Sequence, residues 1–85
     1  MMSNLKNMRV VITGASSGFG SVTAKLLVAQ GCKVTLGARR EDRLEELVAE
    51  LGDSSTYEVT DVKKKDDLDK LVQKSIDTFN GVDAI

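Results

Sequence analysis

The sequence predicts an α/β protein, with helices packed on both faces of a parallel sheet. Two observations indicate this fold class. Short runs rich in β-branched residues, such as MRVVIT at residues 8–13, alternate with longer amphipathic stretches along the 85 residues. A continuous apolar run is typical of a strand buried on both faces. Strands that alternate with helices also imply right-handed parallel crossovers.

The first three predicted elements are a strand, a helix and a strand. Met8–Thr13 is the first strand, and it ends in a glycine. A helix is predicted from about Phe19 to Gln30, because apolar residues recur there at i, i+4 and i+7. These residues are Val22, Leu26 and Ala29. Gly31 is placed to end this helix, and Lys33–Ala38 predicts the second strand.

Two further helices and two further strands complete the pattern. A helix from about Arg40 to Leu51 has a clear amphipathic stripe and Gly52 as its cap. Its stripe consists of Leu44, Leu47, Val48 and Leu51. Ser54–Val59 predicts a weaker third strand, and a third helix spans about Lys64–Phe79. Its apolar face consists of Leu68, Leu71, Val72, Ile76 and Phe79. Val82–Ile85 is expected to begin a fourth strand.

Composition excludes several classes of protein. The 12 basic and 13 acidic residues give a net charge of −1, so a strongly basic nucleic-acid-binding protein is excluded. The longest apolar run, Leu26–Ala29, is far shorter than the ~18 residues of a membrane span. Residues 1–8 have no hydrophobic targeting core, and the single Cys32 suits a reducing compartment. We therefore expect a cytoplasmic protein that binds neither membrane nor nucleic acid.

The rarest residue types exclude further chemistry. With no histidine and one cysteine, the chain cannot form a histidine-based triad, a histidine-ligated metal site or an internal disulfide. We expect no metal site. The run Lys63–Lys65 is interpreted as a solvated helix start rather than a nucleic-acid patch, because three aspartates neutralise it. These are Asp66, Asp67 and Asp69.

The candidate binding site follows from the ends of the three strands. In open parallel sheets, ligands bind outside the carboxyl ends of the strands. A glycine-rich turn follows the first predicted strand, two arginines follow the second, and an aspartate and a valine follow the third. The candidate cofactor-binding residues are therefore Gly14, Ser16, Ser17, Gly18, Phe19, Gly20, Arg39, Arg40, Asp61 and Val62.

The glycine-rich turn has a physical rationale as a phosphate site. Glycines allow the backbone to approach a ligand closely, and the free N–H groups of the following helix favour an anion. Its pattern, G-x-x-x-G-x-G over Gly14–Gly20, differs from both the G-x-G-x-x-G fingerprint and the Walker loop. The missing Gly-Lys-Ser/Thr counts against a mononucleotide kinase. A purely structural strand-to-helix turn remains the alternative interpretation.

Arg39 and Arg40 indicate which dinucleotide binds. A ribose 2′-hydroxyl favours an acidic partner near the end of the second strand, whereas a 2′-phosphate favours an arginine. Ala38 stands near the expected acidic position, and the two arginines follow it. This favours NADP over NAD. The alternative is a solvated helix start, in which an arginine pairs with a nearby acid: Glu41, Asp42 or Glu45.

Three other side chains have competing interpretations. Asp61 either accepts a hydrogen bond from an adenine amino group, or caps the third helix or forms an Asx turn. Cys32 is interpreted as a small apolar filler rather than a nucleophile. Tyr57 is interpreted as structural, because the residue four places on is Asp61 and not a lysine.

Several segments together resemble the short-chain dehydrogenases/reductases. Thr13–Gly20 is similar to that family's T-G-x-x-x-G-x-G cofactor motif, with Phe19 in place of the usual isoleucine or leucine. Gly37–Leu44 resembles the NADP-preferring branch, and Asp61-Val62 resembles the adenine-contacting pair. Phe79–Ile85 is similar to the segment before the N-N-A-G motif. One departure is Ser17, where many NADP-dependent members have a basic residue.

The resemblance implies a Rossmann-type domain and an activity. Residues 1–85 would form its first half, β-α-β-α-β-α-β, which serves the adenosine side of the cofactor. The protein would be an NADP(H)-dependent oxidoreductase, acting on a small carbonyl or alcohol substrate, and a homo-oligomer. The family's catalytic serine and Tyr-x-x-x-Lys pair have no match here, so no catalytic residue is assigned and these 85 residues alone are expected to be inactive. A stand-alone nucleotide-binding or regulatory module is the alternative.

Overall fold

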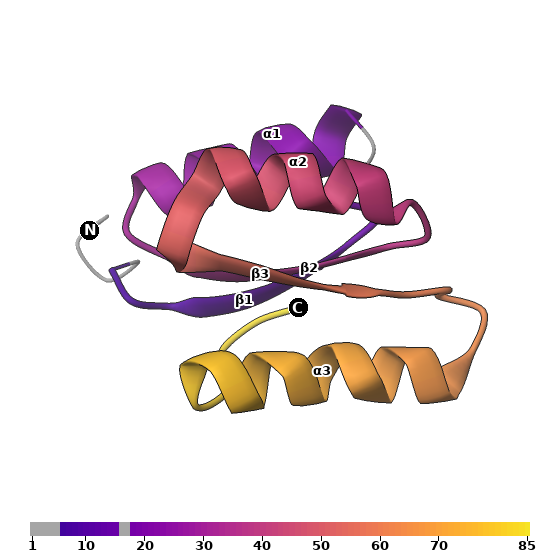
Figure 1. Ribbon diagram of the computed structural model, residues 1–85. Helices are drawn as coiled ribbons and strands as arrows, with labels where there is room; N and C mark the ends of the chain where they lie inside the picture. Colours follow the sequence, from indigo (N-terminus) through magenta and orange to yellow (C-terminus); the bar gives the residue numbers. More distant parts are fainter. Residues whose placement is uncertain (1–5, 16–17) are drawn as a thin grey trace.

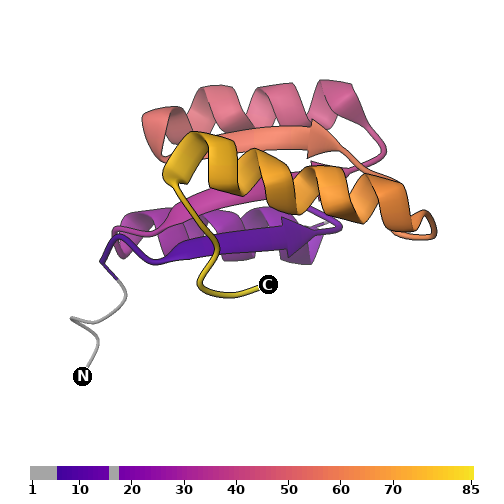
Figure 2. The same ribbon diagram turned by 90° about the horizontal axis from the view of Figure 1, so that it is seen from below.

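The computed structural model describes residues 6–15 and 18–85, and in this part of the chain it contains a three-stranded sheet between two layers of helices (Figure 1). The elements in order are β1 (Arg9–Thr13), α1 (Gly18–Ala29), β2 (Lys33–Ala38), α2 (Glu41–Leu51), the 3-10 turn η2 (Gly52–Ser54), β3 (Ser55–Val59) and α3 (Lys65–Phe79). α1 and α2 cover one face of the sheet and α3 covers the other (Figures 1 and 2). The predicted α/β fold class is confirmed.

The strands lie in the order β1-β2-β3, and both neighbouring pairs are parallel. Their register brings the ends of the three strands to within one residue of one another, because Thr13 lies opposite Gly37 and Ala38 lies opposite Val59. The three loops that leave these strands therefore start from the same edge of the sheet. This alignment places the candidate site.

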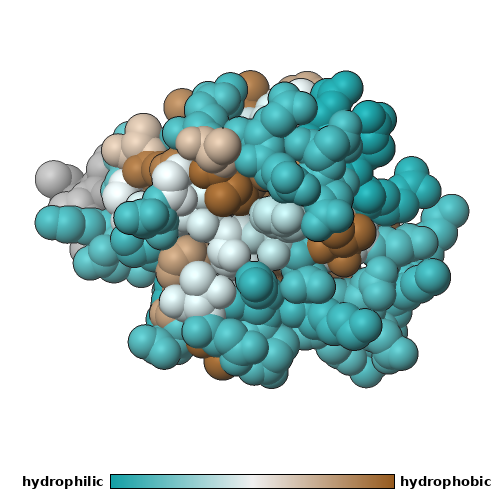
Figure 3. All heavy atoms as spheres, in the orientation of Figure 1, coloured by the Kyte–Doolittle hydropathy of each residue, from teal (hydrophilic) through white to brown (hydrophobic). Residues whose placement is uncertain are grey.

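The main core lies between the sheet and the pair α1–α2. Its buried members from the strands include Val34 and Leu36, and α2 contributes Leu44 and Leu47. Leu44 and Leu47 belong to the predicted stripe of α2, whose other members, Val48 and Leu51, are half-buried. Hydrophilic residues cover the outer surfaces of α2 and α3, and apolar residues are visible between these helices (Figure 3).

The second face of the sheet packs against α3 through Leu71. A Cβ added at Gly37 of β2 would lie only 2.5 Å from Cδ2 of Leu71, so the absence of a side chain at Gly37 lets α3 approach. Leu71 is fully buried, whereas Ile76 of the predicted stripe is 41% exposed. α3 ends as predicted, at Asn80, whose N–H bonds the carbonyl of Ile76 and whose left-handed backbone (φ 68°) turns the chain out of the helix.

The apolar stripe predicted for α1 lies on the wrong side of the helix. Val22 and Leu26 are 54% and 62% exposed, and Ala29 is exposed as well. The buried side is formed by Ala24, with Leu27 packed against the core. α1 carries apolar residues around most of its circumference, so periodicity predicted the helix but could not select its buried face.

The fourth strand predicted at Val82–Ile85 is reduced to a single bridge. Ala84 pairs with Val10 on the side of β1 away from β2, and the Val11 N–H donates to the Ala84 carbonyl at 2.9 Å. The N–H groups of Asp83 and Ala84 both donate to the carbonyl of Arg9, at 2.7 and 3.2 Å. The bonds from Ala84 N–H to Arg9 and from Val11 N–H to Ala84 are the pair that a parallel bridge requires, and the Asp83 bond is additional.

None of the helices in the described part of the chain is long and apolar enough to cross a bilayer.

Candidate functional site

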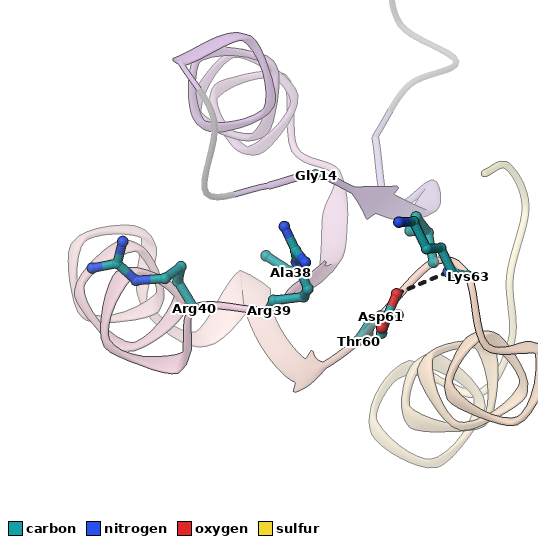
Figure 4. A pocket seen from close by; sticks show the side chains of 8 residues that line it. Gly14, Ala38, Arg39, Arg40, Thr60, Asp61 and Lys63 are labelled. Carbon is teal, nitrogen blue, oxygen red and sulfur yellow. Dashed lines mark hydrogen bonds between the residues drawn. The ribbon is translucent and has the colours of Figure 1, made fainter.

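Backbone hydrogen bonds join the three loops at the carboxyl edge of the sheet. The N–H of Ala15, after β1, donates to the carbonyl of Gly37 at 3.1 Å, and the N–H of Thr60, after β3, donates to the carbonyl of Ala38 at 2.8 Å. A cleft of about 290 Å³ opens between these loops (Figure 4). Its lining consists of Gly14, Ala38, Arg39, Arg40, Thr60, Asp61, Val62 and Lys63.

The glycines of the turn after β1 have three different structural roles. Gly14 adopts a left-handed backbone (φ 65°), which turns the chain out of the strand. A Cβ at Gly20 would overlap the carbonyl oxygen of Gly14 and lie 2.7 Å from the Cα of Ala15, so Gly20 lets α1 start against the turn. A Cβ at Gly18 would meet no described atom within 4 Å. The open space beside Gly18 leaves the N-terminus of α1 accessible to an anion.

The structure brings some of the predicted loop residues to the cleft and leaves others outside it. Gly14 lines the cleft, whereas Gly18, Phe19 and Gly20 lie in the first turn of α1. Phe19 is 91% exposed. The predicted residues Ser16 and Ser17 lie outside the described residues.

Arg39 and Arg40 point in different directions. Figure 4 shows the Arg39 side chain turned toward Gly14, across the cleft, and the Arg40 side chain turned away over α2. Arg40 bonds the carboxylate of Asp42, with 3.2 Å between Nη2 and Oδ2. This pair is the alternative considered from the sequence, and it holds the pKa of Asp42 below its ordinary value. Both partners are 62% exposed, so the ion pair itself is weak.

Asp61 forms the Asx turn that the sequence allowed, and it also lines the cleft. Its Oδ1 accepts a hydrogen bond from the N–H of Lys63 at 3.0 Å. Among the described residues, no group donates to its second oxygen, Oδ2. The turn therefore fixes the carboxylate at the rim of the cleft with one acceptor available to a ligand. Val62, the other predicted residue of this loop, lines the same cleft.

Sequence reasoning missed Thr60 and Lys63 as lining residues. Thr60 is buried, and its hydroxyl donates to the carbonyl of Glu58 at 2.9 Å. Lys63 was assigned to a solvated run of three lysines, but only Lys63 lines the cleft (Figure 4). The available signal was its position two residues after Asp61, because an Asx turn folds the i+2 residue back toward the aspartate.

Cys32 and Tyr57 lie away from the cleft. Cys32 is fully buried in the main core, and this burial raises the pKa of its thiol, so the thiol is an inert filler. The hydroxyl of Tyr57 donates to the Glu41 carboxylate at 3.1 Å. Burial, followed by the Glu41 hydrogen bond, raises the pKa of Tyr57. Neither group contacts the cleft.

The carboxyl edge of the sheet offers groups suited to a polar, anionic ligand. The accessible N-terminus of α1 beside Gly18 lies outside the cleft lining. The cleft itself holds the guanidinium of Arg39, unpaired among the described residues, and an available oxygen on Asp61. A phosphate, a further anion and an amino group have matching partners at this edge. The cleft volume of about 290 Å³ suits part of a cofactor rather than a whole one, because small-molecule sites occupy roughly 300–1,000 Å³. The fold and the cleft define a nucleotide-binding α/β protein.

The chain belongs to the short-chain dehydrogenase family, and the sequence match to this family covers residues 8–85. It is 45% identical over 85 residues to an uncharacterized oxidoreductase of Staphylococcus saprophyticus, covering 99% of this chain and 35% of that protein. It is also 45% identical over 84 residues to an uncharacterized oxidoreductase of Listeria innocua, covering 95% of this chain and 34% of that protein. The chain thus spans about a third of the length of these curated relatives.

Two solved structures share the fold. The 3-ketoacyl-(acyl-carrier-protein) reductase of Brucella melitensis, complexed with NADH, superposes with a TM-score of 0.89 at 34% identity, covering 93% of this chain and 32% of that one. A short-chain dehydrogenase/reductase of unknown function from Caenorhabditis elegans, solved with cofactor, gives a TM-score of 0.86 at 30% identity. It covers 93% of this chain and 31% of that one.

Proposed function

We propose that this chain binds the adenosine side of NADP(H) in an oxidoreductase that interconverts a carbonyl and an alcohol. When bound, the nicotinamide of the cofactor donates or accepts the hydride. In this proposal the turn after β1 binds the pyrophosphate at the N-terminus of α1. Asp61 and Val62 contact the adenine. The relatives named as oxidoreductases support the reaction class, and the two neighbours solved with cofactor, one of them with NADH, support binding of a cofactor.

One observation supports NADP over NAD: the Arg39 side chain reaches from the end of β2 across the cleft toward Gly14 (Figure 4). A 2′-phosphate on the adenosine ribose would give this guanidinium a charged partner. A free 2′-hydroxyl would instead favour an acidic side chain at the end of β2, where Ala38 stands. Lys63 adds a third basic residue to the lining, beside Arg39 and Arg40, and the single carboxylate of Asp61 does not outweigh them.

Arg40 is assigned a secondary role in the same site. Its bond to Asp42 is exposed and therefore weak, so a bound cofactor can draw the guanidinium away from Asp42. We assign Arg39 to the 2′-phosphate and Arg40 to the flank of the adenine. The homo-oligomer and the cytoplasmic location expected from the sequence stay predictions.

Turnover with the two reduced cofactors tests this function. The oxidoreductase that carries this chain is assayed spectrophotometrically with NADPH and with NADH, against a panel of carbonyl substrates. We expect carbonyl-dependent oxidation that is faster with NADPH at subsaturating cofactor. Faster turnover with NADH would contradict the NADP assignment. Nucleotide binding without turnover on any carbonyl or alcohol would favour the alternative, a binding or regulatory module.

A further inference from the structure

Asp67 of α3 is bonded to the loop that carries the candidate adenine contacts. Its Oδ2 accepts a hydrogen bond from the backbone N–H of Asp61 at 2.9 Å. Asp67 lies in the first turn of α3, six residues after the group that it binds. It is half-buried, whereas its neighbour Asp66 is exposed. The carboxylate thus reaches back from the helix into the loop at the rim of the cleft.

This hydrogen bond is one of three that fix Asp61. The carbonyl of Asp61 accepts the N–H of Lys64 at 2.9 Å, and its Oδ1 accepts the N–H of Lys63 at 3.0 Å. The N–H, the carbonyl and one carboxylate oxygen of Asp61 are therefore all engaged in hydrogen bonds. Together they set the direction in which the remaining oxygen, Oδ2, faces the cleft. Of the three bonds, only the one to Asp67 ties Asp61 to a side chain of α3.

The N-cap residue of α3 does not fix the start of the helix with its side chain, so the Asp67–Asp61 hydrogen bond has a larger role there. Lys64 occupies the N-cap position and makes no side-chain capping bond, because a lysine ammonium cannot accept one. The usual fixation of a helix start by its N-cap side chain is therefore missing at this corner. Asp67 instead ties the helix start to the loop, because its carboxylate accepts the N–H of Asp61, three residues before the N-cap.

We propose that Asp67 is a positioning residue, which orients the Asp61 carboxylate and thereby makes the cleft selective for adenine among purine bases. The inference rests on the proposed nucleotide-binding function. Adenine presents an exocyclic amino group that can donate to Asp61 Oδ2, whereas hypoxanthine presents a carbonyl oxygen at the same place. Discrimination between the two bases depends on the orientation of the carboxylate. Binding of the ribose and phosphate groups does not depend on it.

The test compares two ratios of dissociation constants, measured by NMR titration of the protein and its variants. The base ratio is the dissociation constant for IMP divided by that for AMP. The phosphate ratio is the dissociation constant for AMP divided by that for adenosine 2′,5′-bisphosphate. In the unmodified protein we expect a base ratio of about ten or more. In Asp67→Ala we expect the base ratio to fall to about three or less while the phosphate ratio is retained. Loss of a merely structural contact would weaken all three ligands alike and leave both ratios unchanged.

Two variants serve as controls. Asp67→Asn keeps an oxygen that accepts the Asp61 N–H, so it retains the base ratio. Asp66→Ala removes the neighbouring first-turn carboxylate, and it leaves both ratios as they were. If Asp67→Ala does not fold, Asp67→Ser takes its place, because its hydroxyl is too short to reach the loop and leaves the helix start polar.

The outcomes separate the two proposals. A base ratio that is high in the unmodified protein and unchanged in the folded Ala or Ser variant overturns the role of Asp67 while nucleotide binding stands. A base ratio near one in the unmodified protein overturns the selectivity itself. No binding of AMP or of adenosine 2′,5′-bisphosphate to the unmodified protein overturns the proposed function.

Discussion

Gly20 lies so close to Gly14 that a side chain at Gly20 would overlap the Gly14 carbonyl oxygen. The atoms that a Cβ would meet are backbone atoms of the turn, which cannot rotate out of the way as a side chain can. The start of α1 is therefore held against the end of β1. Gly18, two residues earlier in the same turn, has open space where its Cβ would be.

This contrast predicts different outcomes for two alanine substitutions. Gly20→Ala should destabilise the fold by about 1–3 kcal/mol, because the turn must shift to accept the methyl group. Gly18→Ala should leave the free energy of unfolding within about 1 kcal/mol of its original value. Urea unfolding followed by circular dichroism measures both. Equal destabilisation by the two variants would contradict the packing described for Gly20.

The same pair separates folding from ligand binding. We expect Gly18→Ala, although folded, to bind NADPH more weakly, because its methyl group occupies the space through which a phosphate approaches the helix N-terminus. Titration of the folded variant with NADPH is the measurement. Unchanged affinity would show that the cofactor does not approach the backbone at this glycine.

Two buried threonines differ in a way that predicts opposite effects on stability. The hydroxyl of Thr35 is buried in β2 without a hydrogen-bond partner among the described residues, whereas that of Thr60 donates to Glu58. Thr35→Val should raise the free energy of unfolding by about 1 kcal/mol, because it removes an unsatisfied polar atom. Thr60→Val should lower it by about 1 kcal/mol. Denaturant midpoints at constant m-value measure both, and a loss of stability in Thr35→Val would be the contrary result.

Arg9 and Asp83 make stability depend on pH in the acidic range. Arg9 Nε lies 2.9 Å from Asp83 Oδ2, and the hydrogen bonds from Arg9 lower the pKa of Asp83 to about 2. Since an unfolded aspartate titrates at about 3.9, the unfolded state takes up the proton first as the pH falls. The contribution of Asp83 is therefore complete above about pH 5 and is lost between about pH 4 and pH 2.

The measurement is the free energy of unfolding of the unmodified protein and of Asp83→Asn from pH 2 to pH 7. The difference between them should be constant near neutrality and shrink as the pH falls. Asp69→Asn is the matched control, because its pair with Lys65 is exposed and longer, at 3.4 Å. A difference that grows on acidification would contradict the ion pair.

The 85 residues by themselves should show no dehydrogenase activity. They contain no histidine, and their only tyrosine, Tyr57, is bonded to Glu41 rather than paired with a lysine. Spectrophotometric assay of the purified chain with NADPH and carbonyl substrates should therefore match a blank without protein. Turnover above the blank that Gly14→Trp abolishes would refute this expectation.

The strand ends and their loops could be predicted because they are marked locally. A β-branched run followed by a glycine, or by two arginines, indicates both the element and the place where it ends. The edge at which these loops meet follows from parallel topology, so the amino-acid pattern alone was enough to assign Gly14, Arg39 and Asp61 to one cleft.

The remaining features depend on contacts that no local pattern encodes. The buried face of α1 is set by what the sheet places beneath it, and Leu26 is exposed although its spacing is helical. The separation of Arg39 from Arg40 depends on rotamers and on the nearby Asp42. The contact of Asp67 with Asp61 depends on how the loop folds back over six residues.

The most direct measurement of the central claim is the affinity of Arg39→Ala for NADPH and for NADH. A hydrogen bond to a charged group contributes about 1.5–3 kcal/mol, so the dissociation constant for NADPH should rise about ten- to hundredfold while that for NADH stays nearly unchanged. Arg43→Ala, which removes a guanidinium of α2 that does not line the cleft, should change neither constant. Equal weakening of NADPH and NADH binding by Arg39→Ala, or no change in either, would contradict the assignment of Arg39 to the 2′-phosphate.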